Sequence, residues 1–324
     1  MRKKIFALLI AIFFVLNCET AYSQDIINSL RGHNNVIWSF DFNESGTMLI
    51  SGSDDRTVRL WDLQTMTLKE TFVNHTATVW FVDYAPNSKM FASASKDFAV
   101  TLWSEDKTTP LQNFELHEWE VNHLNFSPDG KYIISASGDQ TMMLWDVEKK
   151  LLIRTFEGHQ GGVNVAIFSP DGSKIISGGV DSTIRVWETA TGKELQSIGK
   201  HDGIISMIKY SNNHEFIVSS GWDAKIKVWN AENYNLMKTI SDEYEITSFD
   251  ITNNDKYIIF CSFDFFFLTN FLKICDLSSG EIVHNFELQD AESINYVRFS
   301  PDQKFVVTAG DNKVINFRKN PLEQ

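Results

Sequence analysis

The chain has 324 residues, of which 43% are hydrophobic and 13% aromatic, so it has ample material for a folded core and is not of the disordered type. Its formal net charge is −13, from 42 acidic and 29 basic residues, which argues against a nucleic-acid-binding protein and against docking on an anionic membrane. Average domain size would suggest two domains.

The first 23 residues have the pattern of a cleaved secretory signal. Basic residues 2–4 precede an apolar run at residues 5–16, and small residues lie before the expected cleavage after Ser23. A helix needs about 20 residues to span a hydrocarbon core, so this run is too short for a membrane span. We therefore expect a signal peptide at residues 1–23. A second interpretation is lipoprotein processing with a lipid anchor at Cys18, although the residues before it form a poor lipobox.

A signal peptide implies an exported protein, periplasmic or secreted. The sequons at Asn43, Asn74 and Asn125 would be glycosylation acceptors in an endoplasmic reticulum. Asn125 falls in an expected strand and Asn74 lies beside a repeated histidine, where a glycan has no room. We therefore expect a bacterial protein.

The mature chain would keep two cysteines, Cys261 and Cys275, because Cys18 lies in the signal. The strand pattern puts these two on adjacent strands but out of register by about three residues, or about 10 Å. That is too far for a disulfide without backbone movement. We expect free buried thiols.

Four residue types recur five times with a period of 42 residues. In each set the tryptophan lies 28 residues after the histidine, six after the aspartate and ten after the serine. The sets are His33, Ser51, Asp55, Trp61; His75, Ser93, Asp97, Trp103; His117, Ser135, Asp139, Trp145; His159, Ser177, Asp181, Trp187; and His201, Ser219, Asp223, Trp229.

Two further copies are degenerate. In the sixth the histidine, aspartate and tryptophan places are taken by Glu243, Asp264 and Cys275, and in the seventh by Gln289, Asp311 and Phe317. About five extra residues follow Asp264, within a Phe-rich segment at 265–271. Because both copies lack His, Ser and Trp together, we expect these two units to be the softer part of the structure.

Each unit contains four short strand signals. In the fourth unit these are residues 163–168, 174–177, 183–187 and 193–198, separated by turns such as Ser169-Pro170-Asp171-Gly172. Four short antiparallel strands cannot bury two faces alone, whereas seven such sheets packed around an axis can.

The units resemble WD40 repeats. The resemblance rests on Gly32-His33 … Trp61-Asp62, on Gly158-His159 … Trp187-Glu188, and on the Ser-Pro-Asp-Gly turns at 127–130 and 169–172, and it extends from residue 25 to about 318. It implies an all-β fold: a seven-bladed β-propeller of four-stranded antiparallel blades that forms one domain at residues 24–324. It also implies that residues 26–30, a strand without a unit of its own, complete the last blade and close the ring.

Recurring Ser, His and Asp could suggest a hydrolase. A nucleophile needs one accessible site, however, and here the same set occurs five times beside a bulky Trp. The resemblance implies instead a buried network in which Asp holds His, His meets Ser, and Ser meets the indole N–H. His117-Glu118 starts like a zinc-protease motif, but the next histidine is His123, which is the wrong spacing. We expect no catalytic residues, no metal and no cofactor.

Four tryptophans fall outside the repeat position, and we expect them in loops at one end of the ring. They are Trp38, Trp80, Trp119 and Trp222. They suit partner-binding anchors, with plugs of the channel mouth as the alternative. Phe265, Phe266 and Phe267 are further partner-binding candidates; the insert could instead lengthen two strands or cover the place of the missing Trp.

Acidic residues are expected around these tryptophans, with only Arg56 and Lys96 opposing them: Asp54, Glu118, Glu120, Asp202, Glu245, Asp290 and Glu292. They favour a protein or peptide partner with basic or amine groups, unless they serve only for solvation.

The favoured hypothesis is an exported, non-enzymatic scaffold for protein–protein interaction through this loop end. The alternative is a ligand-binding or catalytic propeller that uses the central channel, and a third is a subunit of a larger envelope complex that buries the insert. The first strands would offer a channel site the side chains of Ser39, Asp83, Asn122, Asn125, Asn164 and Ser206.

Overall fold

The computed structural model describes residues 26–288 and 292–323. The expected signal peptide at 1–23, the anchor position Cys18, and Gln289 and Asp290 lie outside the described residues. Within the described part of the chain, no helix is long and apolar enough to cross a membrane.

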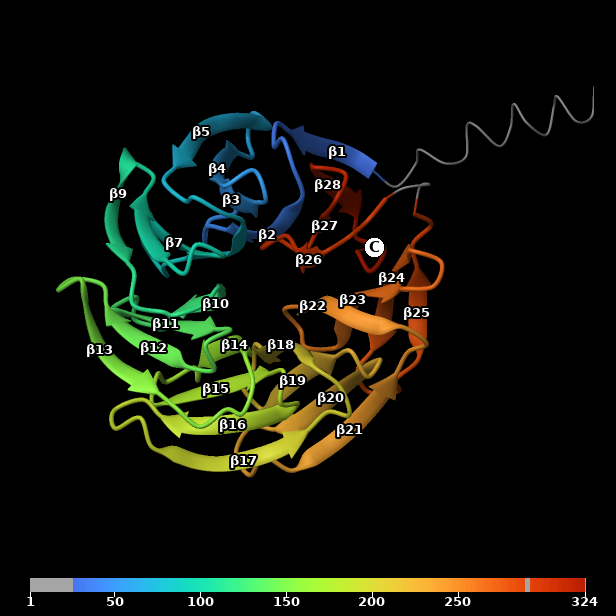
Figure 1. Ribbon diagram of the computed structural model, residues 1–324. Coiled ribbons are helices and arrows are strands. Elements are labelled where there is room, and N and C mark those ends of the chain that lie inside the picture. Colours follow the sequence, from blue (N-terminus) through green and yellow to red (C-terminus); the bar gives the residue numbers. More distant parts are fainter. Residues whose placement is uncertain (1–25, 289–291, 324) are drawn as a thin grey trace, which may run out of the picture.

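Seven four-stranded antiparallel sheets stand like blades around a central axis, as Figure 1 shows. This confirms the all-β, seven-bladed propeller. Blades 1 to 3 are formed by β2 (Ile37–Phe42), β3 (Met48–Ser53), β4 (Thr57–Asp62), β5 (Thr67–Val73); β6 (Val79–Tyr84), β7 (Met90–Ser95), β8 (Val100–Ser104), β9 (Lys107–Phe114); and β10 (Val121–Phe126), β11 (Tyr132–Ser137), β12 (Met142–Asp146), β13 (Leu151–Phe156).

Blades 4 to 7 repeat the arrangement, with the first strand innermost. They are formed by β14 (Val163–Phe168), β15 (Lys174–Gly179), β16 (Thr183–Glu188), β17 (Glu194–Lys200); β18 (Ile205–Tyr210), β19 (Phe216–Gly221), β20 (Lys225–Asn230), β21 (Leu236–Ser241); β22 (Glu245–Ile251), β23 (Tyr257–Asp264), β24 (Thr269–Asp276), β25 (Ile282–Asn285); and β26 (Tyr296–Phe299), β27 (Phe305–Ala309), β28 (Val314–Lys319), β1 (Ile26–Arg31).

The ring is closed by its own N-terminal strand. β1 pairs antiparallel with β28, with Leu30 opposite Ile315, and the two lie side by side in Figure 1. The pairing removes two free strand edges that would otherwise be open to other chains. The expected closure is therefore confirmed.

The core lies between neighbouring blades. Phe72 of blade 1, for example, packs with Phe91 and Trp103 of blade 2, at ring-centroid distances of 5.0 and 5.4 Å. The five repeat tryptophans are at most 4% exposed. Each blade thus buries both faces against its neighbours, which a single sheet of four short strands cannot do.

The Phe-rich insert lengthens two strands of blade 6. β23 and β24 have eight residues each and pair up to Asp264 opposite Thr269, so residues 265–268 form the turn between them. Cys261 and Cys275 lie on these strands opposite Leu272 and Ile258. Both are free, buried thiols, as expected from their register.

Blade 7 replaces the tryptophan with an arginine. Val306 pairs with Arg318, as the corresponding residue of a regular blade pairs with its Trp. Arg318 donates to Thr308 over 2.6 Å, ten residues upstream, and its guanidinium also pairs with the buried carboxylate of Glu292. The expectation that Phe317 holds the tryptophan place is wrong by one residue, because strand pairing and not aromatic character fixes the position.

Similar one-residue shifts occur at two other degenerate places. In blade 7 the turn amide is held by Asn312, whose Oδ1 accepts from the Val314 N–H over 3.2 Å, and not by Asp311. In blade 6 it is Asp242, and not Glu243, that turns into the blade and pairs with Lys273 Nζ at 2.5 Å.

Candidate functional site

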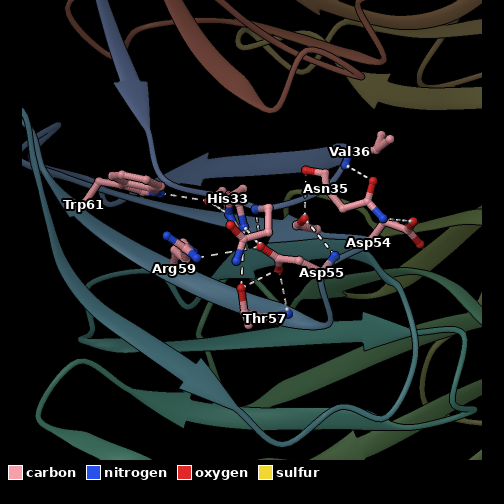
Figure 2. A network of polar contacts seen from close by, with 11 residues as sticks. His33, Asn35, Val36, Asp54, Asp55, Thr57, Arg59 and Trp61 are labelled. Atoms are coloured by element: carbon pink, nitrogen blue, oxygen red, sulfur yellow. Dashed lines mark hydrogen bonds and ion pairs between the residues drawn. The ribbon is translucent and has the colours of Figure 1, made fainter.

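Under one end of the ring, five polar networks join the repeated residues. Figure 2 shows the network of blade 1, in which His33 Nδ1 lies 2.8 Å from Asp55 and Nε2 lies 2.7 Å from Ser51 Oγ. The Trp61 indole N–H donates to the same Ser51 oxygen over 2.8 Å. The other four networks have the same bonds at 2.7–2.9 Å.

Each aspartate also caps the loop of its histidine. Asp55 accepts from the Asn34 N–H over 2.9 Å and from the Thr57 hydroxyl over 2.6 Å. Burial raises the pKa of Asp55, but the bonds from His33 and Thr57 outweigh it and hold the pKa well below its usual range. Burial in turn lowers the pKa of His33. The serines are fully buried and receive the Trp N–H, so the set ties loop, turn and strand together and leaves no exposed nucleophile.

We name the end that carries these histidine loops the histidine end, and the end that carries the Ser-Pro-Asp turns the turn end. The central channel is divided between them. One cavity of about 500 Å³ opens at the histidine end, and another of about 520 Å³ opens at the turn end. Phe81, His123, Met207 and Tyr296 line both cavities and form the partition.

The histidine-end cavity is lined by residues at or near the start of the innermost strand of each blade. These are Trp38, Trp80, Asn122, Asn164, Ser206, Thr247 and Asn295. The Trp38 and Trp80 rings meet edge to face at 4.7 Å. These two therefore belong to β2 and β6 at the channel mouth and not to loops, which corrects the placement expected from sequence.

Trp119 and Trp222 do lie in connections between strands, and they are 57% and 46% exposed. Phe265 is 55% exposed and lies 6.4 Å from Trp222, whereas Phe266 and Phe267 are 96% and 79% exposed. Asp264 supports this tip, since its carboxylate accepts from the N–H groups of Phe266 and Phe267 over 2.8 and 3.2 Å.

Exposed apolar side chains from five successive blades thus gather at the histidine end. We call them the apolar arc: Phe98, Trp119, Val180, Trp222, Phe265, Phe266, Phe267 and Leu268. Phe98, which stacks on Trp119 at a ring-centroid distance of 5.9 Å, and Val180 were missed by the sequence analysis, since each looked like an ordinary turn residue. Leu268 lies within the Phe-rich segment at 265–271 that the sequence had singled out. The signal that could have found Phe98 and Val180 is their place directly beside a repeated aspartate, Asp97 or Asp181.

Fewer acidic side chains are exposed around these tryptophans than the sequence suggests. Glu118 and Asp202 are exposed, and Asp202 pairs with Lys225 at 2.6 Å. Asp54 accepts from Thr78 and from Asn35. Glu120 and Glu245 are half-buried, whereas Glu292 is buried against Arg318. Asp290 lies outside the described residues.

At the turn end, polar side chains link neighbouring inner strands. Asp41, Asp83, Asn125 and Asp250 each accept the backbone N–H of a residue on the next blade, over 2.8–3.1 Å. Lys209 pairs with Asp250 at 2.7 Å, and Arg298 pairs with Asp41. Of the residues considered for a channel site, Asn122, Asn164 and Ser206 lie at one end, Asp83 and Asn125 at the other, and Ser39 is fully buried. These side chains therefore do not meet at a single site in the structure.

Metal-ligating groups do not cluster in the described part of the chain: no three His, Cys, Asp or Glu residues are placed to hold an ion.

Two family models match the chain. The model described as "IFT122 first beta-propeller" matches residues 58–319, and the model described as "WD domain, G-beta repeat" matches residues 24–62.

Individual relatives match over short segments. Eukaryotic translation initiation factor 3 subunit I of Schizosaccharomyces pombe is 37% identical over 51 residues, 16% of this chain and 16% of the relative. WD repeat-containing protein 18 of Danio rerio is 36% identical over 72 residues, 20% of this chain and 16% of the relative. U3 small nucleolar RNA-associated protein 21 of Saccharomyces cerevisiae is 44% identical over 45 residues, 14% of this chain and 5% of the relative. The chain therefore spans about a sixth or less of the length of these relatives.

These relatives contradict the expected localisation. They come from eukaryotes, and their names refer to translation initiation and to small nucleolar RNA, which are intracellular. The expectation of a bacterial protein exported to the periplasm or secreted is therefore wrong.

Proposed function

The chain belongs to the WD40-repeat β-propeller proteins, and from that premise we propose that it is a non-enzymatic scaffold that binds protein partners through its histidine end. The relatives support the class of function, since one is named as a subunit of a translation initiation factor. The partners of these relatives are not assigned to this chain.

The observation that carries the proposal is the apolar arc. Isolated exposed apolar side chains are normal, but contiguous apolar patches on a soluble protein mark contact sites. Here five successive blades each contribute at one end, and the rings of Phe98 and Trp119, like those of Trp222 and Phe265, lie in contact. Phe266, in the turn between β23 and β24, is 96% exposed. Aromatic side chains of this kind bring large contact area at low entropic cost and dominate binding energy at interfaces.

A catalytic function, or binding of a free ligand along the whole central channel, has weaker support. The partition by Phe81, His123, Met207 and Tyr296 leaves two separate cavities. The network serines are fully buried and already bonded. The scaffold is therefore the function that the geometry favours.

The test is affinity capture of partners from the native cell with the double variant F266S/F267S. The matched control is L236S/M237S, because Leu236 and Met237 are 50% and 61% exposed on the outer strand β21, away from the histidine end. We expect the partners recovered by the wild type to be lost from the tip variant and kept by the control. Undiminished recovery by F266S/F267S would contradict the proposal.

A further inference from the structure

Among the residues that line the cavity at the histidine end, Glu120 is the one with a carboxyl side chain. Burial lowers the pKa of His123 to about 3 and raises the pKa of Tyr296 well above its usual value, so both are neutral near pH 7. The Glu120 side chain therefore has no oppositely charged partner among the other lining residues, and a charge without such a partner is costly where water is partly excluded.

Glu120 is held at the cavity wall by its neighbours. Its backbone oxygen accepts from the Gly138 N–H over 2.9 Å and from the Ser137 hydroxyl over 3.0 Å. One carboxylate oxygen, Oε2, accepts from the Trp80 indole N–H over 3.3 Å. The other, Oε1, has no hydrogen-bond partner within the described part of the chain.

Two polar neighbours of Glu120 in the lining, Asn122 and Asn164, also present acceptors. Asn122 Nδ2 donates to the Val163 carbonyl over 2.9 Å, and Asn164 Nδ2 donates to the Ile205 carbonyl over 3.1 Å, both on the next blade. Their amide oxygens have no partner among the described residues. The cavity thus offers three acceptor oxygens to a donor-rich ligand, beside one buried donor without a partner, the indole N–H of Trp38. A guanidinium has five N–H donors and an ammonium three, and neither has an acceptor.

Three indole rings complete the lining, those of Trp38, Trp80 and Trp222. The face of an indole attracts a cation. The ring of Trp80 already attracts one, since Lys96 Nζ lies over it at 5.9 Å from the ring centroid.

We propose that this cavity binds one monovalent organic cation, the guanidinium of an arginine or the ammonium of a lysine on a partner segment. Glu120 supplies the counter-charge, the amide oxygens of Asn122 and Asn164 accept hydrogen bonds, and the tryptophans enclose the side chain. This inference rests on the proposed function, because it names the chemistry that the scaffold recognises beside its apolar arc.

The test measures binding of three capped tripeptides to the full chain by tryptophan fluorescence and calorimetry: acetyl-Ala-Arg-Ala-amide, acetyl-Ala-Lys-Ala-amide and the same peptide with citrulline, the neutral isostere of arginine. We expect at least one cationic peptide to bind about tenfold or more tightly than the citrulline peptide. The stronger of the arginine and lysine peptides identifies the source of the cation.

The variant E120Q keeps an oxygen for the Trp80 N–H and removes the charge, so we expect it to abolish the preference for the cationic peptide. E118Q is the matched control, since Glu118 is exposed on the same loop and does not line the cavity. Equal binding of the citrulline peptide, an unchanged preference in E120Q, or no saturable binding of either cationic peptide at millimolar concentration would overturn the inference. None of these results depends on the Phe tip, so a failure here is distinct from failure of the F266S/F267S test.

Discussion

The two ends of the ring differ in how many of their polar side chains have hydrogen-bond or ion-pair partners within the protein. At the turn end the carboxylates of Asp41 and Asp250 bond to the next blade and pair with Arg298 and Lys209. At the histidine end the networks are closed beneath the surface, but above them lie exposed apolar side chains and unpaired acceptors. Cavity volume does not separate the ends, since the channel cavities measure about 520 and 500 Å³.

The difference teaches which end is available for binding. Polar groups that already have partners gain little from a ligand, because bonds to the protein would have to be exchanged. Apolar surface gains from being removed from water. An acceptor without a protein partner can bond to a donor on a ligand with no protein bond to break. We therefore assign stability to the turn end and recognition to the histidine end, and each variant below separates the two.

The largest effect is expected at the turn end, from Asp250→Ala. It leaves the buried Phe299 N–H without its 2.8 Å acceptor and Lys209 without its 2.7 Å partner. We expect the free energy of unfolding to fall by about 3 kcal/mol, measured by urea denaturation, with partner capture unchanged.

The control for this variant is Lys89→Ala, which breaks the exposed pair with Asp106 at 3.0 Å and should cost less than about 1 kcal/mol. If D250A is as stable as the control, or if it loses its partners while folded, the division of roles between the ends fails.

The second effect is expected in binding, from the double variant W119A/W222A. Both side chains are about half exposed, so we expect partner affinity to fall about tenfold or more while the unfolding free energy changes by no more than about 1 kcal/mol. Leu195→Ala on the outer strand β17, where Leu195 is 45% exposed, is the control. Equal affinity of W119A/W222A and L195A, compared by surface plasmon resonance, would remove the two tryptophans from the interface.

The histidines give the ends different pH responses. Burial lowers the pKa of His33, His159 and His201 from 6.5 in the folded protein, so below about pH 6.5 the unfolded chain binds more protons. The stability that these neutral histidines contribute is present above about pH 6.5 and is lost as the pH falls. We expect hydrogen exchange in blades 1, 4 and 5, corrected for intrinsic rates, to quicken between pH 7 and pH 5. Unchanged protection there would contradict this account of the networks.

A second pH effect has the opposite sign and comes from the turn end. Burial raises the pKa of Asp83 from 3.8 to about 7, so between these values the folded protein binds the additional proton. Stability from this group is therefore present below about pH 4 and is lost as the pH rises toward 7. Asp83→Asn keeps an acceptor for the Phe126 N–H, which lies 2.8 Å from Asp83. We expect the free energy of unfolding of the variant, relative to that of the wild type, to increase as the pH rises over this range. A difference that stays constant with pH would refute this expectation.

The regular part of the fold could be predicted from sequence because it repeats. Five sets of His, Ser, Asp and Trp in fixed register determine the blades, and a strand without a unit of its own determines the closure by β1. The register of Cys261 and Cys275 followed from the same pattern.

The degenerate blades could not be predicted to the residue. A single aromatic such as Phe317 looks like a tryptophan substitute, yet pairing with Val306 gives the place to Arg318. What persists in that place is a donor to the hydroxyl ten residues upstream, and Arg318 N–H and Trp indole N–H both serve. Whether blades 6 and 7 are softer than the others, as their sequences suggest, stays a prediction for hydrogen exchange.

The candidate site was predicted only in part. Trp119 and Trp222 were expected on the surface and are exposed there, whereas Trp38 and Trp80 are the second residues of the inner strands β2 and β6. The partition of the channel depends on side chains from non-adjacent blades, and no local pattern in the sequence relates Phe81 to Tyr296.

The central claim, that partners bind at the histidine end, is tested most directly by hydrogen exchange of the protein alone and with a captured partner. The account predicts new protection at the histidine end, over residues 117–122, 220–224 and 264–270. Protection confined to the turn end, over residues 127–131, 169–174 and 211–216, would contradict it.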